Sequence, residues 1–302
     1  MQGQALIRFL IKNKGSIIPD NPASFLRIMK QMTLQDIQAI SLEILKHLHD
    51  FCVANNIKYS LGYGTLIGAV RHKGIIPWDD DIDVVMMRED YERFCLVYED
   101  SSNYKLFSFN RRNTYSSVAR LCDMKKTIVK TGTPLFTEPT GVWIDIFPFD
   151  SVDDDKMIFE QRRKEISEAH SSVVKCRYEM RKWNGIKDMV LHIRGFVSWL
   201  LNVRKARKRI WDIVEQQNKL CVSFAPSTNK MMSILAFPTY IDRDYTPKKV
   251  FERVIDATFE GNQYKIMEGY DQWLTIVYGD YMTPPPVQKQ TRGHQVHAYY
   301  WK

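Results

Sequence analysis

Residues 63–83 read YGTLIGAVRHKGIIPWDDDID, and this stretch decides the fold predicted for the 302-residue chain. It follows a short predicted strand, residues 57–61, which the glycines at positions 62 and 64 end. A short helix is expected over residues 65–72, then a loop, then a second strand over residues 82–87 from its Ile, Val and Met run. The stretch therefore places a Gly-Thr turn between strand and helix, and an acidic run at the next strand.

Asp81 and Asp83 form an acidic pair two positions apart. In a strand, residues i and i+2 share a face, so both carboxylates are expected to point the same way while Ile82 and Val84 enter the core. Two like charges side by side are unfavourable unless a cation lies between them, and oxygen-only ligands suit Mg²⁺ or Mn²⁺. By itself the pair indicates a metal site no more strongly than a solvated acidic surface.

Two features near the pair favour the metal site. Backbone N–H groups at the Gly64-Thr65 turn can hold phosphate oxygens, because they lie where a helix is expected to begin. Asp79 and Asp80 directly precede the pair, so most of this short run is acidic. Such a run would repel itself strongly without cations, so the loop is expected to bind metal or to lie in solvent.

A third feature is Asp145, the single carboxylate in the apolar strand predicted over residues 142–147. A lone Asp in such a run costs several kcal/mol unless its oxygens are satisfied. Binding a metal ion as its third ligand would satisfy the carboxylate oxygens of Asp145, and a structural hydrogen bond is the alternative.

The order of these features resembles the nucleotidyltransferase superfamily, whose fold is that of polymerase-β-like enzymes. The resemblance implies an α/β (α+β) fold, with a mixed sheet flanked by helices and a helical insertion. The segment over residues 71–80 makes the spacing longer than in compact members of the superfamily.

Three regions are expected along the chain. Residues 1–155 form the catalytic core, residues 156–225 form a helical insertion that contacts the acceptor, and residues 226–302 complete the core. Within them, helices are predicted over 33–51 (with a capping box of Thr33 and Asp36), 89–99, 153–183, 186–203, 204–221 and 270–278. Further strands are predicted over 104–109, 116–122, 142–147 (ended by Pro148) and 231–237, and a hairpin around Gly261-Asn262.

Charge and cysteine usage indicate the class of partner and the cellular compartment. The net charge of +8 indicates an anionic partner such as a nucleotide, a nucleic acid or an acidic membrane surface. No RNA-binding module or RGG segment is visible, so no nucleic-acid partner is expected. The basic run over residues 204–209 is typical of a solvated helix face, and peripheral contact with anionic membrane is the alternative. Five scattered cysteines, with no secretory signal or membrane-spanning run, predict free thiols and a cytoplasmic protein, peripheral at most to the inner membrane face.

Residues 63–83 closely resemble the LicD family, which comprises phosphocholine transferases and relatives of fukutin and fukutin-related protein. The match is long and ungapped. Residues 141–148 are similar to the family's second acidic strand, and residues 274–282, Pro284-Pro285 and residues 297–301 are similar to its C-terminal signature. The resemblance runs from about residue 30 to the end and is weakest over 156–225.

This resemblance implies a reaction. A phospho-linked group moves from a CDP-activated donor, most often CDP-choline, to the hydroxyl of a glycan or lipid-linked oligosaccharide, and CMP leaves. A bacterial cell and an acceptor built at the inner membrane face are expected. CDP-ribitol, CDP-glycerol or CDP-ethanolamine as donor is the alternative within the same fold, and an RNA or nucleotide nucleotidyltransferase is a more distant one.

We predict that Asp81, Asp83 and Asp145 hold one or two Mg²⁺ (or Mn²⁺) ions that bridge the donor phosphates. The general base for the acceptor hydroxyl is expected among Asp145, Asp79 and Asp80, and the sequence does not decide between them.

The donor itself is expected to meet a wider set of residues. The Gly64-Thr65 turn should contact a phosphate, and positive side chains should offset phosphate charge. A tryptophan in the loop is expected to pack there, with stacking on cytosine as the alternative, and the tail is expected to return to the site. The positive side chains are Arg71, Lys73 and Arg120, the tryptophan is Trp78, and the tail residue is His297.

Overall fold

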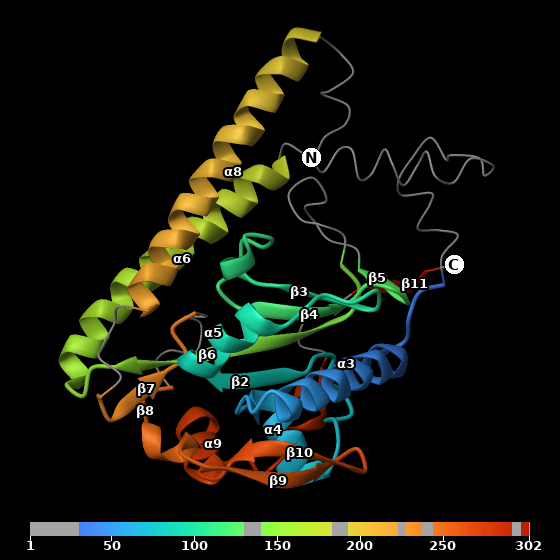
Figure 1. Cartoon of the computed structure of the whole chain (residues 1–302), viewed down its shortest axis with the longest axis vertical. Coiled ribbons are helices and arrows are strands. Elements are labelled where there is room, and N and C mark those ends of the chain that lie inside the picture. The colour runs from blue at the N-terminus through green and yellow to red at the C-terminus, as the bar shows by residue number, and fades with distance from the viewer. Residues whose placement is uncertain are drawn as a thin grey trace.

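Figure 1 shows a mixed α/β body from which two long helices extend as a pair. The computed structural model describes residues 30–129, 140–182, 193–222, 228–236, 244–291 and 297–301. Parts of the predicted segments, at residues 186–192, 223–225 and 237, lie outside the described residues.

A seven-stranded mixed sheet forms the centre of the body. β2 runs parallel to β6, and the other pairs are antiparallel. This is the mixed sheet expected from the sequence. Its main path runs β1 (Ser60–Leu61), β2 (Asp83–Met87), β6 (Trp143–Val152), β4 (Ala119–Asp123) and β3 (Tyr104–Phe107), while β7 (Met231–Ser233) pairs with β6 and with β8 (Thr246–Pro247).

Helices flank this sheet. α3 (Leu34–Ala54) begins at the capping box predicted from Thr33 and Asp36, whose two reciprocal hydrogen bonds are both present. It packs on α5 (Arg88–Val97), where the rings of Phe51 and Phe94 meet edge to face. α4 (Tyr63–Ile67) continues into a π-helical turn over Gly68–His72, and α9 (Tyr270–Tyr278) packs beside α4.

Two smaller pairings complete the body. β9 (Val254–Phe259) and β10 (Asn262–Met267) form the predicted hairpin, with Gly261 at its turn in a left-handed conformation. β5 (Thr127–Val129) pairs with β11 (Ala298–Tyr300), which brings the end of the chain beside the segment that leads into β6.

β6 corrects one prediction, because it continues through Pro148 to Val152. Proline lacks the N–H that a ladder partner would accept. Pro148 lies between Ile146, the last described residue that pairs with β4 on that side, and Asp150, the first that pairs with β7. The missing donor therefore interrupts no ladder there.

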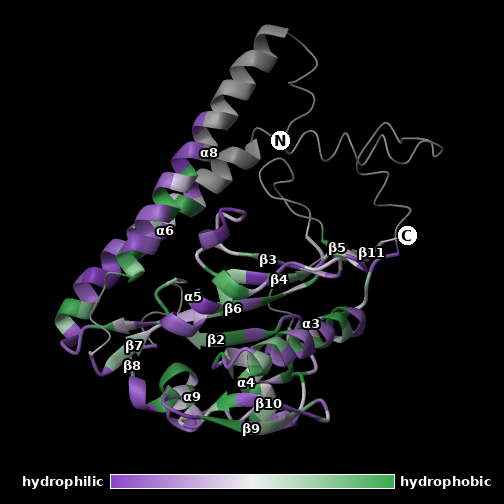
Figure 2. Cartoon of the chain, viewed as in Figure 1, coloured by the Kyte–Doolittle hydropathy of each residue, from purple (hydrophilic) through white to green (hydrophobic). Residues whose placement is uncertain are grey.

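The insertion corrects a second prediction. Residues 193–222 form one helix, α8 (Ile193–Val222), where two helices were predicted to meet at position 204. Neither glycine nor proline stands at that junction, and Ile210, Val214 and Cys221 continue a buried stripe. α8 packs along α6 (Lys156–Lys182), at whose start Asp155 accepts a hydrogen bond from the N–H of Met157. Figure 2 shows that most of the coloured length of both helices is hydrophilic outside this stripe.

Two composition-based predictions concern the chain as a whole. Cys52, Cys95, Cys122 and Cys221 are free and buried, as predicted. Among the described residues, no helix combines the length and apolar character that crossing a bilayer requires.

Candidate active site

Three charged side chains form a row across the centre of the sheet. Asp83 at the start of β2 lies opposite Asp145 on β6, and Asp145 lies opposite Arg120 on β4. Residues paired across neighbouring strands project from the same face of a sheet, so the row has the order carboxylate, carboxylate, guanidinium. Parallel pairing of β2 with β6 thus brings together the two acidic strands that the sequence indicated separately.

Both oxygens of Asp145 accept hydrogen bonds from protein donors. Arg120 donates through Nε to Oδ1 at 2.8 Å, and the indole Nε1–H of Trp143 donates to Oδ2 at 3.0 Å. The Arg120 guanidinium also stacks 4.5 Å from the centre of the Trp143 ring. The structural hydrogen bond weighed for Asp145 is therefore present, although each carboxylate oxygen keeps a second lone pair for a cation.

Asp79, Asp80 and Asp81 gather in the loop before β2, with one carboxylate oxygen from each within 4.8 Å of the others. Asp83 and Asp145 are not part of this group, although Asp79 and Asp81 lie close enough to act on the charge of Asp83. β2 begins only at Asp83, so Asp81 lies in the preceding loop. The prediction that Asp81 and Asp83 are a strand pair is wrong in this respect. The ladder of β2 with β6 begins at Asp83, opposite Asp145, and β1 pairs no further than Val84, so Asp81 lies before both ladders.

The charges of this cluster act on one another. Burial first, then repulsion by Asp81 and a hydrogen bond with it, raise the pKa of Asp79 to about 8. Burial, followed by repulsion from Asp81, Asp145 and Asp79, holds the pKa of Asp83 well above its usual range. Carboxyls that raise one another's pKa form a site that a cation would stabilise, and their oxygen-only donor set fits Mg²⁺ or Mn²⁺.

Gly64 and Thr65 lie in the first turn of α4, which begins at Tyr63 and not at residue 65 as predicted, and they support the acidic loop. The N–H of Asp83 donates to the Thr65 hydroxyl at 2.9 Å, and Gln38 of α3 donates to the carbonyl of Asp79 at 2.8 Å. A Cβ on Gly64 would lie 2.7 Å from the Asp79 carboxylate, so this close approach requires glycine. The turn therefore shapes the loop that carries the carboxylates.

Most of the other predicted residues contact different parts of the molecule. Arg71 donates to the carbonyl of Tyr281 at 2.5 Å, and the carbonyl of exposed Lys73 accepts from the N–H of Glu260. Neither has a described hydrogen bond or ion pair with the carboxylates. Trp78 is half-buried against the main core, and His297 is exposed just before β11.

Two supporting residues were missed in the sequence. Trp143 could have been found, because it stands two positions before Asp145 on one strand and must share its face. Gln38 could not, because its side chain reaches Asp79 from a helix far away in the sequence.

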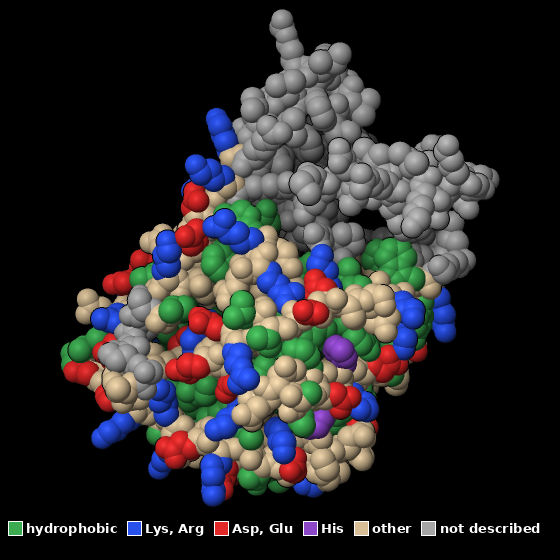
Figure 3. Space-filling view, viewed as in Figure 1, with side chains coloured by type: hydrophobic (Ala, Val, Ile, Leu, Met, Phe, Trp, Pro, Cys, Tyr) green, Lys and Arg blue, Asp and Glu red, His purple; other side chains and the backbone are tan. Residues whose placement is uncertain are grey.

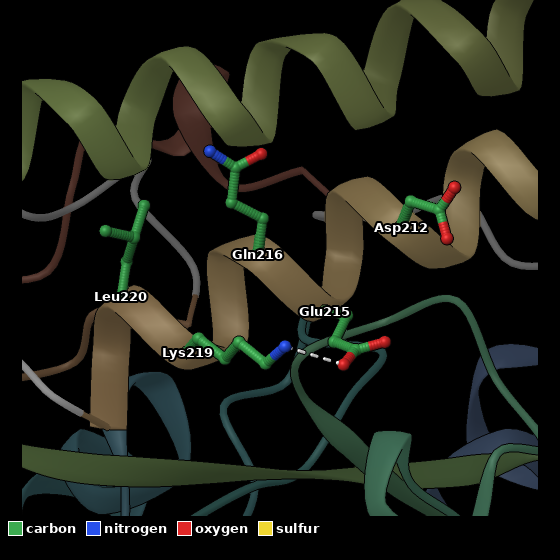
Figure 4. A pocket seen from close by; sticks show the side chains of 5 residues that line it. All are labelled: Asp212, Glu215, Gln216, Lys219 and Leu220. Atoms are coloured by element: carbon green, nitrogen blue, oxygen red, sulfur yellow. Dashed lines mark ion pairs between the residues drawn. The ribbon is translucent and has the colours of Figure 1, made fainter.

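A pocket lies on α8, and its lining residues are far in sequence from this row of charges. Figure 4 shows its five side chains on α8, with Lys219 and Glu215 joined by an ion pair of 2.8 Å. Glu215 also lies 3.9 Å from Arg112, which follows β3. The pocket is lined by Asp212, Glu215, Gln216, Lys219 and Leu220.

A mixed sheet flanked by helices is consistent with an α+β nucleotidyltransferase-like fold. Residues 56–175 match the family model described as LicD/FKTN/FKRP, nucleotidyltransferase domain. The chain is also 33% identical, over 278 residues, to the lipopolysaccharide cholinephosphotransferase LicD of Haemophilus influenzae, a match that covers 90% of this chain and 99% of that protein. The chain therefore belongs to the LicD family, as its sequence had indicated.

Shorter matches join it to two uncharacterized rickettsial proteins. One, from Rickettsia typhi, is 46% identical over 67 residues, which is 22% of each chain. The other, from Rickettsia prowazekii, is 48% identical over 63 residues, or 20% of this chain and 24% of that protein.

Proposed function

We propose that this chain transfers phosphocholine from CDP-choline to a hydroxyl of a cell-surface glycan, with Mg²⁺ as cofactor. The name of the Haemophilus relative supports phosphocholine as the group and lipopolysaccharide as the class of acceptor. The observation that carries the reaction class is the in-register pair Asp83 and Asp145, with Asp79 and Asp81 close enough to repel the Asp83 carboxylate.

In this reaction the acceptor oxygen attacks the phosphorus of the choline phosphate. A new P–O bond forms, the bond to CMP breaks, and the hydroxyl proton passes to a base. Asp145, Asp79 and Asp80 are the candidates for that base: both oxygens of Asp145 already accept hydrogen bonds, and Asp79 has a raised pKa and a hydrogen bond with Asp81.

The metal is proposed to lie among Asp81, Asp83 and Asp145. When bound, it would neutralise the negative charge that develops on the donor phosphates. Arg120 is proposed to help: its side chain is 42% exposed, and only its Nε is engaged with Asp145 in a described bond. Its other N–H groups can face a phosphate.

The remaining donor contacts are proposals with less support. The Gly64-Thr65 turn is proposed to contact a phosphate through backbone N–H groups. Arg71, Lys73 and His297 keep the roles inferred from the family. Arg71 and Lys73 both contact residues nearer the C-terminus, Tyr281 and Glu260, and Arg71 also donates to His72.

Isothermal titration with CDP-choline, CDP-ribitol and CDP-ethanolamine, each with Mg²⁺, tests the proposal. Wild type should prefer CDP-choline, and Asp81→Asn should bind and turn over poorly. Asp256→Asn is the matched control, because Asp256 is exposed and pairs with Lys265 on the β9–β10 hairpin. If no CDP compound binds, the reaction is wrong; preference for another CDP compound changes the cargo; an unimpaired Asp81→Asn removes the metal assignment.

We also propose peripheral contact with anionic membrane, since the acceptor is expected at the inner face of the cytoplasmic membrane. Lys205, Lys208 and Arg209 are exposed on α8. Each basic residue near an anionic surface contributes about 1 kcal/mol. Figure 3 shows Lys and Arg interspersed with Asp and Glu over the visible face, so the proposal rests on this local cluster and not on a basic patch of that face. Equal flotation with anionic and neutral liposomes would remove the proposal.

A further inference from the structure

One residue of the β9–β10 hairpin, Glu260, bonds to two residues of the loop that leads to the acidic run. The N–H of Glu260 donates to the carbonyl of Lys73 at 3.0 Å, and its Oε1 accepts from the N–H of Ile75 at 2.8 Å. Between them, a Cβ on Gly74 would lie 2.4 Å from the same Oε1. The hairpin turn therefore fits closely over this part of the loop.

The backbone on both sides of this contact is unusual. Lys73 has a φ of 58° and Glu260 a φ of 48°, so both adopt the left-handed conformation that non-glycine residues rarely take. Such conformations persist where the surroundings fix them, and they concentrate near functional sites. Here the two residues are bonded to each other through their backbones.

The contact continues towards the carboxylates through a short segment. Ile76, next to Ile75, is buried, and its carbonyl accepts from the N–H of Asp79 at 2.9 Å. A shift of the loop at Ile75 would therefore move the turn that presents Asp79, Asp80 and Asp81.

We propose that Glu260 is a positioning residue: it fixes the loop over residues 73–79 so that the acidic run meets Asp83 and Asp145 at a spacing suited to a divalent cation. This inference rests on the proposed metal site. It assigns to the C-terminal hairpin, which lies beyond the family match over residues 56–175, a part in building that site.

Glu260→Gly tests the proposal without harming the fold, because glycine accepts the left-handed backbone at this position while the carboxylate is lost. Mn²⁺ affinity should fall about tenfold, as for other outer supports of metal ligands. Hydrogen exchange of the metal-free protein should become faster over residues 71–81. The melting temperature should stay equal or rise.

Three variants complete the design. Glu260→Gln keeps an oxygen acceptor for Ile75 and should restore wild-type behaviour. Glu268→Gln removes a carboxylate of the same hairpin that pairs with Arg253, and should change neither exchange nor affinity. Gly74→Ala should displace the Glu260 side chain and weaken Mn²⁺ binding, but should add little in the Glu260→Gly background.

The outcomes separate the two proposals. Unchanged exchange or unchanged Mn²⁺ affinity in Glu260→Gly overturns the positioning role, and so does an affinity loss that merely follows a lower melting temperature. A wild-type protein that binds no Mn²⁺ refutes the metal site itself, and that result is known before any variant is compared.

Discussion

At the scale of single residues, Arg120 joins the acidic row to the strand beyond it. Asp145 is only 14% exposed, and Arg120 supplies its positive partner. Arg120→Gln should lower the free energy of unfolding by about 1–3 kcal/mol, because the carboxylate loses a charged donor. Urea denaturation measures this, and added Mg²⁺ should shrink the loss by replacing the missing charge.

Arg253→Gln is the control for that experiment, since Arg253 is 75% exposed in its pair with Glu268. Surface pairs of this kind contribute little, so its unfolding curve should match wild type. A loss for Arg120→Gln that Mg²⁺ leaves unchanged would contradict the shared site.

Thr65 gives a second prediction at this scale. Its buried hydroxyl accepts a hydrogen bond from the N–H of Asp83. Valine has nearly the same shape as threonine but no hydroxyl, so Thr65→Val leaves that N–H without its acceptor. The expected cost is about 1–3 kcal/mol of unfolding free energy, while Thr65→Ser should cost less because it keeps the oxygen. Chemical denaturation of both variants decides it, and equal stability would contradict the prediction.

At the scale of elements, the acidic loop should make stability depend on pH. The pKa of Asp79 is about 8 in the fold and near its ordinary value of 3.8 in the unfolded chain. The folded state then holds the extra proton, so this stability is present at low pH and is lost as pH rises towards about 8. Asp83 acts in the same direction.

Melting temperatures of cation-free protein between pH 7 and 8.5 test this, because the pKa values of His47, His49 and His72 are lowered by burial and these groups are neutral there. Stability should decline over that window, and saturating Mg²⁺ should flatten the decline. Burial raises the pKa of Asp244 to about 7, so Asp244 also contributes to the decline in stability, and Mg²⁺ should not alter its contribution. A slope that Mg²⁺ leaves intact would contradict the prediction.

Elements with local signals were predictable from the sequence. The start of α3 follows from a capping box, and α9 and the β9–β10 hairpin follow from periodicity and a Gly-Asn turn. Features set by distant partners were not. The continuation of β6 past Pro148 depends on β7, and the start of β2 at Asp83 depends on where its pairing with β6 begins.

The candidate site divides in the same way. Asp83 and Asp145 could be chosen from residue type and pattern, and the register then places them opposite each other. The engagement of Arg120 by Asp145 and the support from Gln38 and Glu260 depend on tertiary contacts, which no local pattern encodes.

At the scale of the whole molecule, the helical pair enters and leaves the sheet at one place. Val152 of β6 pairs with Met231 of β7, and Asp154 accepts from the N–H groups of Lys230 and Met231. We propose that residues 156–225 form an acceptor subdomain carried on the core. Replacing residues 156–227 by a short turn should preserve CDP-choline binding and abolish transfer to the glycan.

That replacement also removes Phe159, Ile166 and Cys221 from a small apolar cluster with Val152 and Leu235, so a lower melting temperature is expected. Donor binding by calorimetry and transfer to purified glycan are measured in parallel. Loss of donor binding in a protein with an intact circular dichroism spectrum would contradict the separation of the two roles.

The adjacency of β6 and β7 has a kinetic consequence. Their pairing must close a long loop, and the entropic cost of closure rises with loop length. Antiparallel packing of α6 on α8 forms through contacts nearer in sequence and brings the two ends of that loop together before the strands meet. We therefore expect the helical pair to form early and β7 to join the sheet late, with the helices shortening the effective loop.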